Sequence, residues 1–400
     1  MSKEATEISV DKHKLCLKKI NSTQEFRELK DKWDSFLEQS SSPNIFLTWE
    51  WLFTWWELYS KGYQLFVLLA LDQNENILGI VPLCLTRLGP LRLKVLKFLG
   101  TKEVCSDHLD FILRKGSEKE TFNLFLDYLE ENPKEWDLLD LTDFREGSSG
   151  LAQIQTWAEK NRFGFSINLW TVCPYAILTN EWENFLGGLS ANSRKDIRRQ
   201  LRLMEESGKI RFSSVKDRDE VMLRMDDLFR LHSKRWSALG EMGVFQRERF
   251  NRFHKKIAEL FFEKGWLSVS YLANEENIFA IYYNFQYLNK IYAYQSGIDP
   301  DWENFSPGTV ALALTIREAI FQGFREFDFL RGDASYKYKW TEKERKNQQV
   351  LVWNKNFRSL IYKNFLSLLE KSKNLAKRYL PDFVIKVLKY FWQKAGFAGE

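Results

Sequence analysis

The chain has 400 residues, of which 44% are hydrophobic and 28% are charged. This size and composition predict a globular protein of about two domains and argue against a disordered or fibrous chain. We expect a cytoplasmic protein, because no apolar run reaches the roughly 18 residues of a membrane span, the N-terminus lacks an apolar signal core, and the four cysteines are scattered singly.

The net charge of +5 is unevenly distributed along the chain. Residues 356–400 hold nine Lys and Arg against three Asp and Glu, so the preceding residues are nearly neutral as a group. A neutral body disfavours nucleic acid as a partner. The four histidines share no metal-ligand spacing, so we expect no metal site.

The first half alternates strand and helix patterns. Residues 13–20 predict a strand, residues 22–39 one amphipathic helix capped by Ser22 or Thr23, and residues 49–59 a second, Trp-rich helix of structural character. Two apolar runs around a polar turn at 72–76 predict a hairpin. Further strands are expected at 93–100, 108–113, 136–144 and 165–178, and further helices at 117–132 and 150–162.

The second half repeats this order without obvious sequence identity. Helices are expected at 190–208, 218–236, 247–265 and 309–324, and strands at 209–215, at 326–330 and, as a three-stranded meander, within 267–298. The predicted fold class is α/β with mixed sheets, in two tandem domains and a helical C-terminal extension. The domains are expected at 1–174, 175–355 and 356–400, with the first boundary at Pro174.

Two groups of residues on predicted helices suggest binding. Arg194, Arg198 and Arg202 are spaced at i, i+4 and i+8, so they form one stripe that suits phosphate or, alternatively, is a solvated basic face. His232, Arg235 and Trp236 lie within one turn and either line a cleft or pack in the core. The order "FDFLRGDASYKYKW", residues 327–340, places charges and aromatic residues at the end of a strand, where α/β folds often carry their sites.

Four stretches together resemble a known family: "IFLTWEWLFTWWELY" followed by "GIVPL", "SANSRKDIRRQLRLMEESG", "LHSKRW", and "YAYQSGIDPDWENFSPGT" continuing to "FDFLRGDASYKYKW". Over roughly residues 14–355 the chain resembles double-GNAT acyltransferases, the branch with FemAB-like proteins and the acetyltransferase domains of polysaccharide operons. The resemblance implies tandem GNAT domains and acyl-CoA as donor. The coenzyme A loop of single-domain members is degenerate here, because "FSPGTV" keeps Gly308 at a helix start and Ser306 as a cap but lacks the second glycine and the Arg or Gln.

The resemblance also suggests roles for individual residues. Lys337 would stabilise negative charge on the acyl carbonyl oxygen, and Asp333 would take the proton of the nucleophile. Alternatively, Lys337 and Lys339 cover an aromatic surface while Asp328 or Asp333 pairs with Arg331. Tyr294 and Ser296 would line a gap where a central strand leaves its neighbour, with Tyr294 as a catalytic candidate. The remaining candidates for substrate binding are Tyr336, Arg331, Asp107 and Asp110, the last two at an interdomain cleft or in a structural hydrogen-bond cluster.

The function implied by the resemblance is acyl transfer from acyl-CoA to an amine or hydroxyl of a sugar or lipid-linked glycan, in envelope or exopolysaccharide synthesis, at one active site in the second domain. The alternatives are aminoacyl transfer from charged tRNA and a non-catalytic partner of a polysaccharide synthesis complex. Two basic amphipathic helices, at 357–379 and around 383–391, either lie on the inner face of the cytoplasmic membrane or pack on the protein body.

Overall fold

The computed structural model describes residues 8–9, 15–275 and 277–379, with side chains described as far as Leu368. The first half contains β1 (Ile8–Ser9), β2 (Cys16–Ile20), α1 (Thr23–Glu28), α2 (Lys30–Glu38), η1 (Ile45–Leu47), α3 (Trp49–Tyr59), β3 (Tyr63–Leu71), β4 (Ile77–Leu88), β5 (Leu93–Phe98), β6 (Ile112–Leu113), α4 (Glu118–Glu131), β7 (Leu138–Arg145), α5 (Ser149–Lys160) and β8 (Gly164–Ile177).

The second half contains α6 (Trp182–Gly187), α7 (Ala191–Ser207), β9 (Arg211–Ser214), α8 (Arg218–Ala238), η2 (Val244–Gln246), α9 (Glu248–Glu263), β10 (Leu267–Ala273), β11 (Ile278–Tyr287), β12 (Lys290–Ile298), η3 (Pro300–Phe305), α10 (Pro307–Phe321), β13 (Glu326–Asp328), η4 (Lys337–Lys339), β14 (Glu344–Trp353) and α11 (Phe357–Tyr379). The second predicted tail helix, around 383–391, lies outside the described residues.

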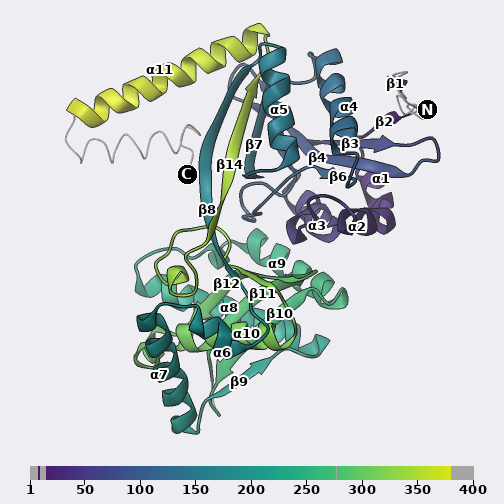
Figure 1. Ribbon diagram of the computed structural model, residues 1–400. Helices are drawn as coiled ribbons and strands as arrows, with labels where there is room; N and C mark the ends of the chain where they lie inside the picture. Colours follow the sequence, from purple (N-terminus) through teal and green to yellow (C-terminus); the bar gives the residue numbers. More distant parts are fainter. Residues whose placement is uncertain (1–7, 10–14, 276, 380–400) are drawn as a thin grey trace.

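The described strands form one mixed sheet in the order β1-β2-β3-β4-β5-β7-β14-β8-β13-β12-β11-β10-β9, with β6 beside β4. Helices cover this sheet in two lobes, and the long strands β8 and β14 run between the lobes (Figure 1). The architecture is mixed α/β, with two tandem units and a C-terminal helix. We call the part around β2–β7 the first lobe and the part around β9–β13 the second lobe.

β8 serves both lobes, because its pairing partner changes along its length. Residues 164–174 pair with β14, whereas residues 175–177 pair antiparallel with β13. β14 also pairs with β7, so a strand late in the sequence completes the sheet of the first lobe. The predicted boundary after Pro174 falls where β8 changes partner.

The α3 helix packs against both lobes and joins their hydrophobic cores. Large apolar residues occur on all sides of this helix, and every residue from Trp49 to Trp56 is buried. The Trp51 ring contacts Phe253 and Phe261 of α9 and Phe285 of β11, with ring centroids 4.9–6.1 Å apart. This aromatic contact fixes the orientation of the first lobe against the second, which matters because the candidate site lies where the lobes meet.

Several local predictions differ from the structure. The expected helix at 22–39 divides at Leu29 into α1 and α2, with a capping box between Ser22 and Glu25 at its start. The strands expected at 108–113 and 326–330 shorten to β6 and β13, and no prediction covered β14. β13 is short because Leu330 takes a left-handed φ of 55°, which turns the chain out of the strand.

Candidate active site

The candidate site begins where two parallel strands separate. β12 and β13 pair only from Lys290–Glu326 to Tyr292–Asp328. β13 then ends, and the following chain turns to β8, where Gly332 N–H donates to the Val172 carbonyl at 2.9 Å. The edge of β12 from Ala293 onward therefore faces an opening instead of a neighbouring strand.

Two adjacent hollows occupy this opening. The inner chamber has a volume of about 280 Å³ and lies between the open edge of β12, the 329–337 loop and residues Cys105 and Asp107 of the first lobe. The outer groove has about 550 Å³ and lies along η3, the start of α10 and the end of α8. Tyr282, Ser296, Leu312 and Tyr336 line both, so the two hollows lie next to each other.

Lys337 lies in the wall of the inner chamber with only 5% of its surface exposed. Its ammonium group donates to the carbonyl oxygens of Leu330 at 2.9 Å and Arg331 at 2.6 Å. Burial lowers the pKa of Lys337, although the carboxylates of Asp107, Asp328 and Asp333 act in the opposite direction. The two carbonyls hold the ammonium group in place, and its third N–H is left for another acceptor.

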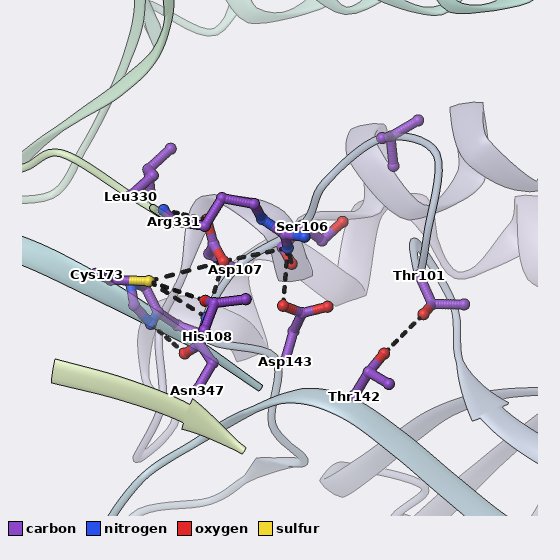
Figure 2. A network of polar contacts seen from close by, with 12 residues as sticks. Thr101, Ser106, Asp107, His108, Thr142, Asp143, Cys173, Leu330, Arg331 and Asn347 are labelled. Atoms are coloured by element: carbon purple, nitrogen blue, oxygen red, sulfur yellow. Dashed lines mark hydrogen bonds and ion pairs between the residues drawn. The ribbon is translucent and has the colours of Figure 1, made fainter. Parts of the chain in front are cut away.

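The loop that carries these carbonyls is anchored to the first lobe by an ion-pair clamp (Figure 2). The Arg331 guanidinium lies 2.8 Å from Asp143 and 3.2 Å from Asp107, and it also donates to the Ser106 carbonyl. The Arg331 backbone N–H donates to Asp107 at 3.0 Å. Burial raises the pKa of Asp143, while the guanidinium acts against this rise. The clamp thus positions the loop, and with it Lys337, from across the lobe boundary.

A chain of buried polar groups continues from the clamp into the sheet (Figure 2). Asn347 of β14 donates from Nδ2 to Asp107 at 2.8 Å, and its Oδ1 lies 2.7 Å from His108 Nδ1. His108 Nε2 lies 3.1 Å from Asp328 at the end of β13. Cys173 also contacts Asp107.

Tyr294 lines the inner chamber, but its hydroxyl bonds to groups that do not belong to the chamber lining. The hydroxyl donates to the Val104 carbonyl of the first lobe at 2.7 Å and lies 3.1 Å from His254 Nε2. Tyr294 is also the extra residue of a β-bulge, because Gln295 pairs with Tyr283 while Ala293 pairs with Asn284. The bulge turns this tyrosine toward the lobe boundary.

Comparisons with known proteins support the identity of the second lobe. Residues 191–338 match the family model described as acetyltransferase (GNAT) domain. This part of the chain is similar to GNAT acetyltransferase domains. The match includes the open edge of β12, the start of α10 and Lys337, and it makes the protein a transferase.

Solved structures share the fold of the whole chain at low sequence identity. The structure of FemX matches 86% of this chain and 99% of its own, with a TM-score of 0.60 and 11% identity. A conserved protein of unknown function from Bacteroides thetaiotaomicron matches 82% of this chain and 97% of its own, with a TM-score of 0.52 and 12% identity.

A third similar structure is the C-terminal domain of a putative lysylphosphatidylglycerol synthetase from Agrobacterium fabrum. It matches 86% of this chain and 95% of its own, with a TM-score of 0.50 and 11% identity. No curated protein sequence matches the chain at a significant level. The likenesses show that the whole chain shares the fold of FemX, and they leave donor and acceptor undefined.

The GNAT domain brings most of the sequence-predicted residues to the cleft. The residues that line the inner chamber or the outer groove are Asp107, Arg235, Tyr294, Ser296, Ser306, Gly308, Arg331, Tyr336 and Lys337. A Cβ at Gly308 would lie 2.6 Å from Ile298 Cδ1, so a larger residue there would displace the end of the Ile298 side chain. Asp333 is exposed in the loop before Lys337.

Other predicted residues lie away from the cleft. His232 is buried against Phe245 and Trp236, and burial lowers its pKa to about 4. Asp110 accepts from Ser42 at 2.8 Å inside the first lobe, and burial raises its pKa to about 6. Neither residue borders the two hollows.

The arginine stripe on α7 is exposed and does not border the cleft. Arg198 pairs with Glu183 at 2.5 Å, Arg202 lies 3.6 Å from Glu206, and Arg194 donates to the Gly187 carbonyl. Each guanidinium therefore already has a protein partner. Whether the stripe binds phosphate stays a prediction.

Sequence reasoning missed three members of the buried network. Asp143, Asn347 and Cys173 come from β7, β14 and β8, and only the strand pairing brings them to Asp107. The sequence around Asn347 contained one indication of this strand, namely a short polar run followed by apolar residues. Among the described residues, no group of His, Cys, Asp and Glu side chains is arranged to hold a metal ion.

Proposed function

We propose that the protein transfers an acyl group from acyl-CoA to an amine or hydroxyl of a sugar or lipid-linked glycan, in the cleft of the GNAT domain. The observation that carries this proposal is the open edge of β12 opposite Lys337. An extended donor can add to a free strand edge through its own amide groups. Its thioester carbonyl would then lie beside backbone N–H groups and the Lys337 ammonium, which suit a developing oxyanion.

The outer groove supports acyl-CoA as the donor. The N-terminus of α10 lies in this groove, together with the cationic side chains of Arg235 and Lys339. Helix N-termini and cations both favour a pyrophosphate. Asp299 and Glu303 also line the groove, but Lys234 lies 2.6 Å from Asp299 and offsets its charge. Glu303 is exposed and would oppose an anion.

Matched charge variants test the donor by calorimetric titration with coenzyme A. Arg235→Ala should weaken binding by about three- to tenfold, and Glu303→Gln should tighten it by a similar factor, because exposed charges act modestly through water. Arg230→Ala is the control, since Arg230 is an exposed arginine of the same helix that pairs with Asp227 instead. Binding that is unaffected by both groove variants, or no binding of coenzyme A, would refute this site for the donor.

The FemX-like fold makes aminoacyl-tRNA the second candidate donor. FemX matches nearly the full length of both chains, yet at 11% identity this likeness carries only the fold. The nearly neutral net charge of residues 1–355 disfavours binding of an RNA. A gel-shift titration with charged and uncharged tRNA, beside the coenzyme A titration, separates the two donors.

The proposed class of acceptor rests on the family resemblance. The helix α11 suggests that the protein binds this acceptor at a membrane surface. Phe357, Leu360 and Leu368 are 75%, 57% and 65% exposed, while Tyr362 and Leu366 pack toward Trp353 in the first lobe. Arg358 and Lys363 add positive charge to this helix. None of the described helices combines the length and hydrophobicity that crossing a bilayer requires. We propose that the exposed face of α11 binds an anionic membrane surface from the cytoplasmic side.

Co-sedimentation with vesicles of anionic and of neutral lipid tests the membrane proposal. The full chain should sediment with anionic vesicles at low salt, and a variant with serine at positions 357, 360 and 368 should stay in the supernatant. A triple serine variant at Leu169, Leu223 and Leu239, exposed leucines elsewhere, is the control. Equal recovery of wild type and the α11 variant in the supernatant would refute membrane attachment by this helix.

A further inference from the structure

The inner chamber is larger than an acetyl group requires. Its volume is about 280 Å³. A cavity of about 150 Å³ already takes up benzene, so the chamber has room for roughly twice the six carbons of that ring. An acetyl group has three non-hydrogen atoms.

Part of the chamber wall is apolar. Val244 of η2, Phe250 of α9, Leu312 of α10 and Phe329 after β13 all line it. Phe250, Leu312 and Phe329 are at most 3% exposed, so their positions are fixed by the core. Such a wall binds hydrocarbon through area removed from water and offers no partner to a hydroxyl.

Charged side chains in the chamber wall pair with other protein groups. Arg331 and Asp107 bind each other across the lobe boundary, and Lys337 donates to two backbone carbonyls. A hydroxyl-rich sugar ring would leave hydroxyls unpaired against the apolar part of the wall. The acyl part of the donor fits the chamber better than a glycan acceptor does.

The path from the outer groove also leads the acyl end of the donor into the chamber. Along α10 the walls pass from Ser306–Thr309 in the groove to Leu312 in both hollows, and along β12 from Ile298 through Ser296 to Ala293. A donor with its phosphates at the start of α10 and its arm on the open edge of β12 thus points its acyl group inward.

We infer that the transferred group is an apolar acyl group larger than acetyl, of about four to eight carbons, held in the inner chamber. This inference rests on the proposed use of acyl-CoA in the cleft. It assigns the specificity for acyl size to the second lobe, with Val244 at the half-buried end of the wall as the residue that limits chain length.

Calorimetric titration with free coenzyme A, acetyl-CoA and hexanoyl-CoA tests this inference. Each buried methylene strengthens binding by about fourfold, so wild type should bind hexanoyl-CoA at least tenfold more tightly than acetyl-CoA. Val244→Phe should reduce this ratio to near one by filling the chamber, whereas Val244→Ala should keep or raise it. Val215→Phe is the control, because Val215 is also half-buried but lines a separate cavity of about 190 Å³.

The outcomes separate this inference from the proposed function. Tight binding of hexanoyl-CoA that Val244→Phe abolishes and Val215→Phe leaves intact supports the inference. Binding of coenzyme A with equal affinity for acetyl- and hexanoyl-CoA overturns it and leaves the donor proposal standing. A chain-length preference that Val244→Phe does not change also overturns it. Failure of all three ligands to bind overturns the donor proposal and the inference together.

Discussion

Lys337→Ala should remove acyl transfer while the protein stays folded. In the proposed reaction the third N–H of the Lys337 ammonium stabilises the oxyanion that forms when the acceptor attacks the thioester. Loss of one such preorganised donor costs on the order of 100-fold or more in kcat, equal to about 2.7 kcal/mol of transition-state stabilisation. The Michaelis constant for the donor should change much less, because the groove contacts remain.

The effect on stability should be smaller than the effect on turnover. The substitution leaves the Leu330 and Arg331 carbonyls without their present donor, which costs about 1–3 kcal/mol for each carbonyl that stays buried and unpaired. It also removes an ammonium group whose burial is unfavourable, as its lowered pKa indicates. We expect a net change within about 2 kcal/mol, which a protein of ordinary stability tolerates.

The assay follows release of the coenzyme A thiol, with urea unfolding of each variant as the measure of fold. Lys343→Ala is the control for removal of a nearby charge, because Lys343 is exposed and lies outside the cleft. A folded Lys337→Ala protein with turnover within threefold of wild type would refute the role given to Lys337.

The pH dependence gives a second readout of the same residue. Burial lowers the pKa of Lys337, so the ammonium form is lost at lower pH than for an exposed lysine, whose pKa is about 10.4. If the charged form is required, kcat falls as the pH rises through this lowered value, and Lys337→Arg moves the fall to higher pH. The unfolded chain binds this proton more tightly than the folded protein, so the Lys337 contribution to stability increases with pH between the two values.

Three further predictions address the clamp, the tyrosine and a buried carboxyl. Asp107→Asn removes one of the two carboxylates at Arg331. It should lower the free energy of unfolding by about 2–4 kcal/mol and kcat by at least tenfold. Unchanged values in urea unfolding and kinetics would contradict the clamp. Tyr294→Phe loses the bond to Val104 and should cost about 1 kcal/mol with kcat within threefold, whereas a 100-fold loss of kcat would make its hydroxyl catalytic. Burial raises the pKa of Glu50 to about 7. Between about pH 4.5 and 7 the folded state therefore holds a proton that the unfolded state has released, and the free energy of unfolding falls as the pH rises through this range. Glu50→Gln should therefore be more stable than wild type at pH 8 by up to about 2 kcal/mol and not at pH 4, and parallel stability curves would contradict this.

The sequence predicted those helices and strands in which buried apolar residues recur with the period of the element and lie close together in the chain. α3 begins and ends at the residues expected from its aromatic pattern, and the hairpin of β3 and β4 follows from two apolar runs around a polar turn. β14 could not be found this way, since its first half is polar. Its Asn347 is fully buried and bonds to Asp107, in the loop after β5, and to Cys173 on β8, which lie 240 and 174 residues earlier in the sequence.

The residues of the candidate site were likewise predicted where local sequence determines their place and missed where long-range pairing determines it. The end of β13 was predicted to carry charges beside a turn, and Arg331 and Lys337 lie there in the structure. The partners of those charges could not be predicted from the sequence. Asp143 comes close to Arg331 only because the sheet joins the two lobes. The Arg194, Arg198 and Arg202 spacing correctly indicates one face of a helix, but spacing alone does not say what that face meets.

The most direct test of the proposed reaction is a crystal structure of the full chain with a non-hydrolysable thioether analogue of acyl-CoA. Our account predicts the pyrophosphate at the start of α10 beside Arg235 and Lys339, the arm along the open edge of β12, and the carbonyl oxygen near Lys337. Analogue bound in the first lobe, or bound in the cleft with its carbonyl far from Lys337, would contradict the assignment of acyl transfer to this site.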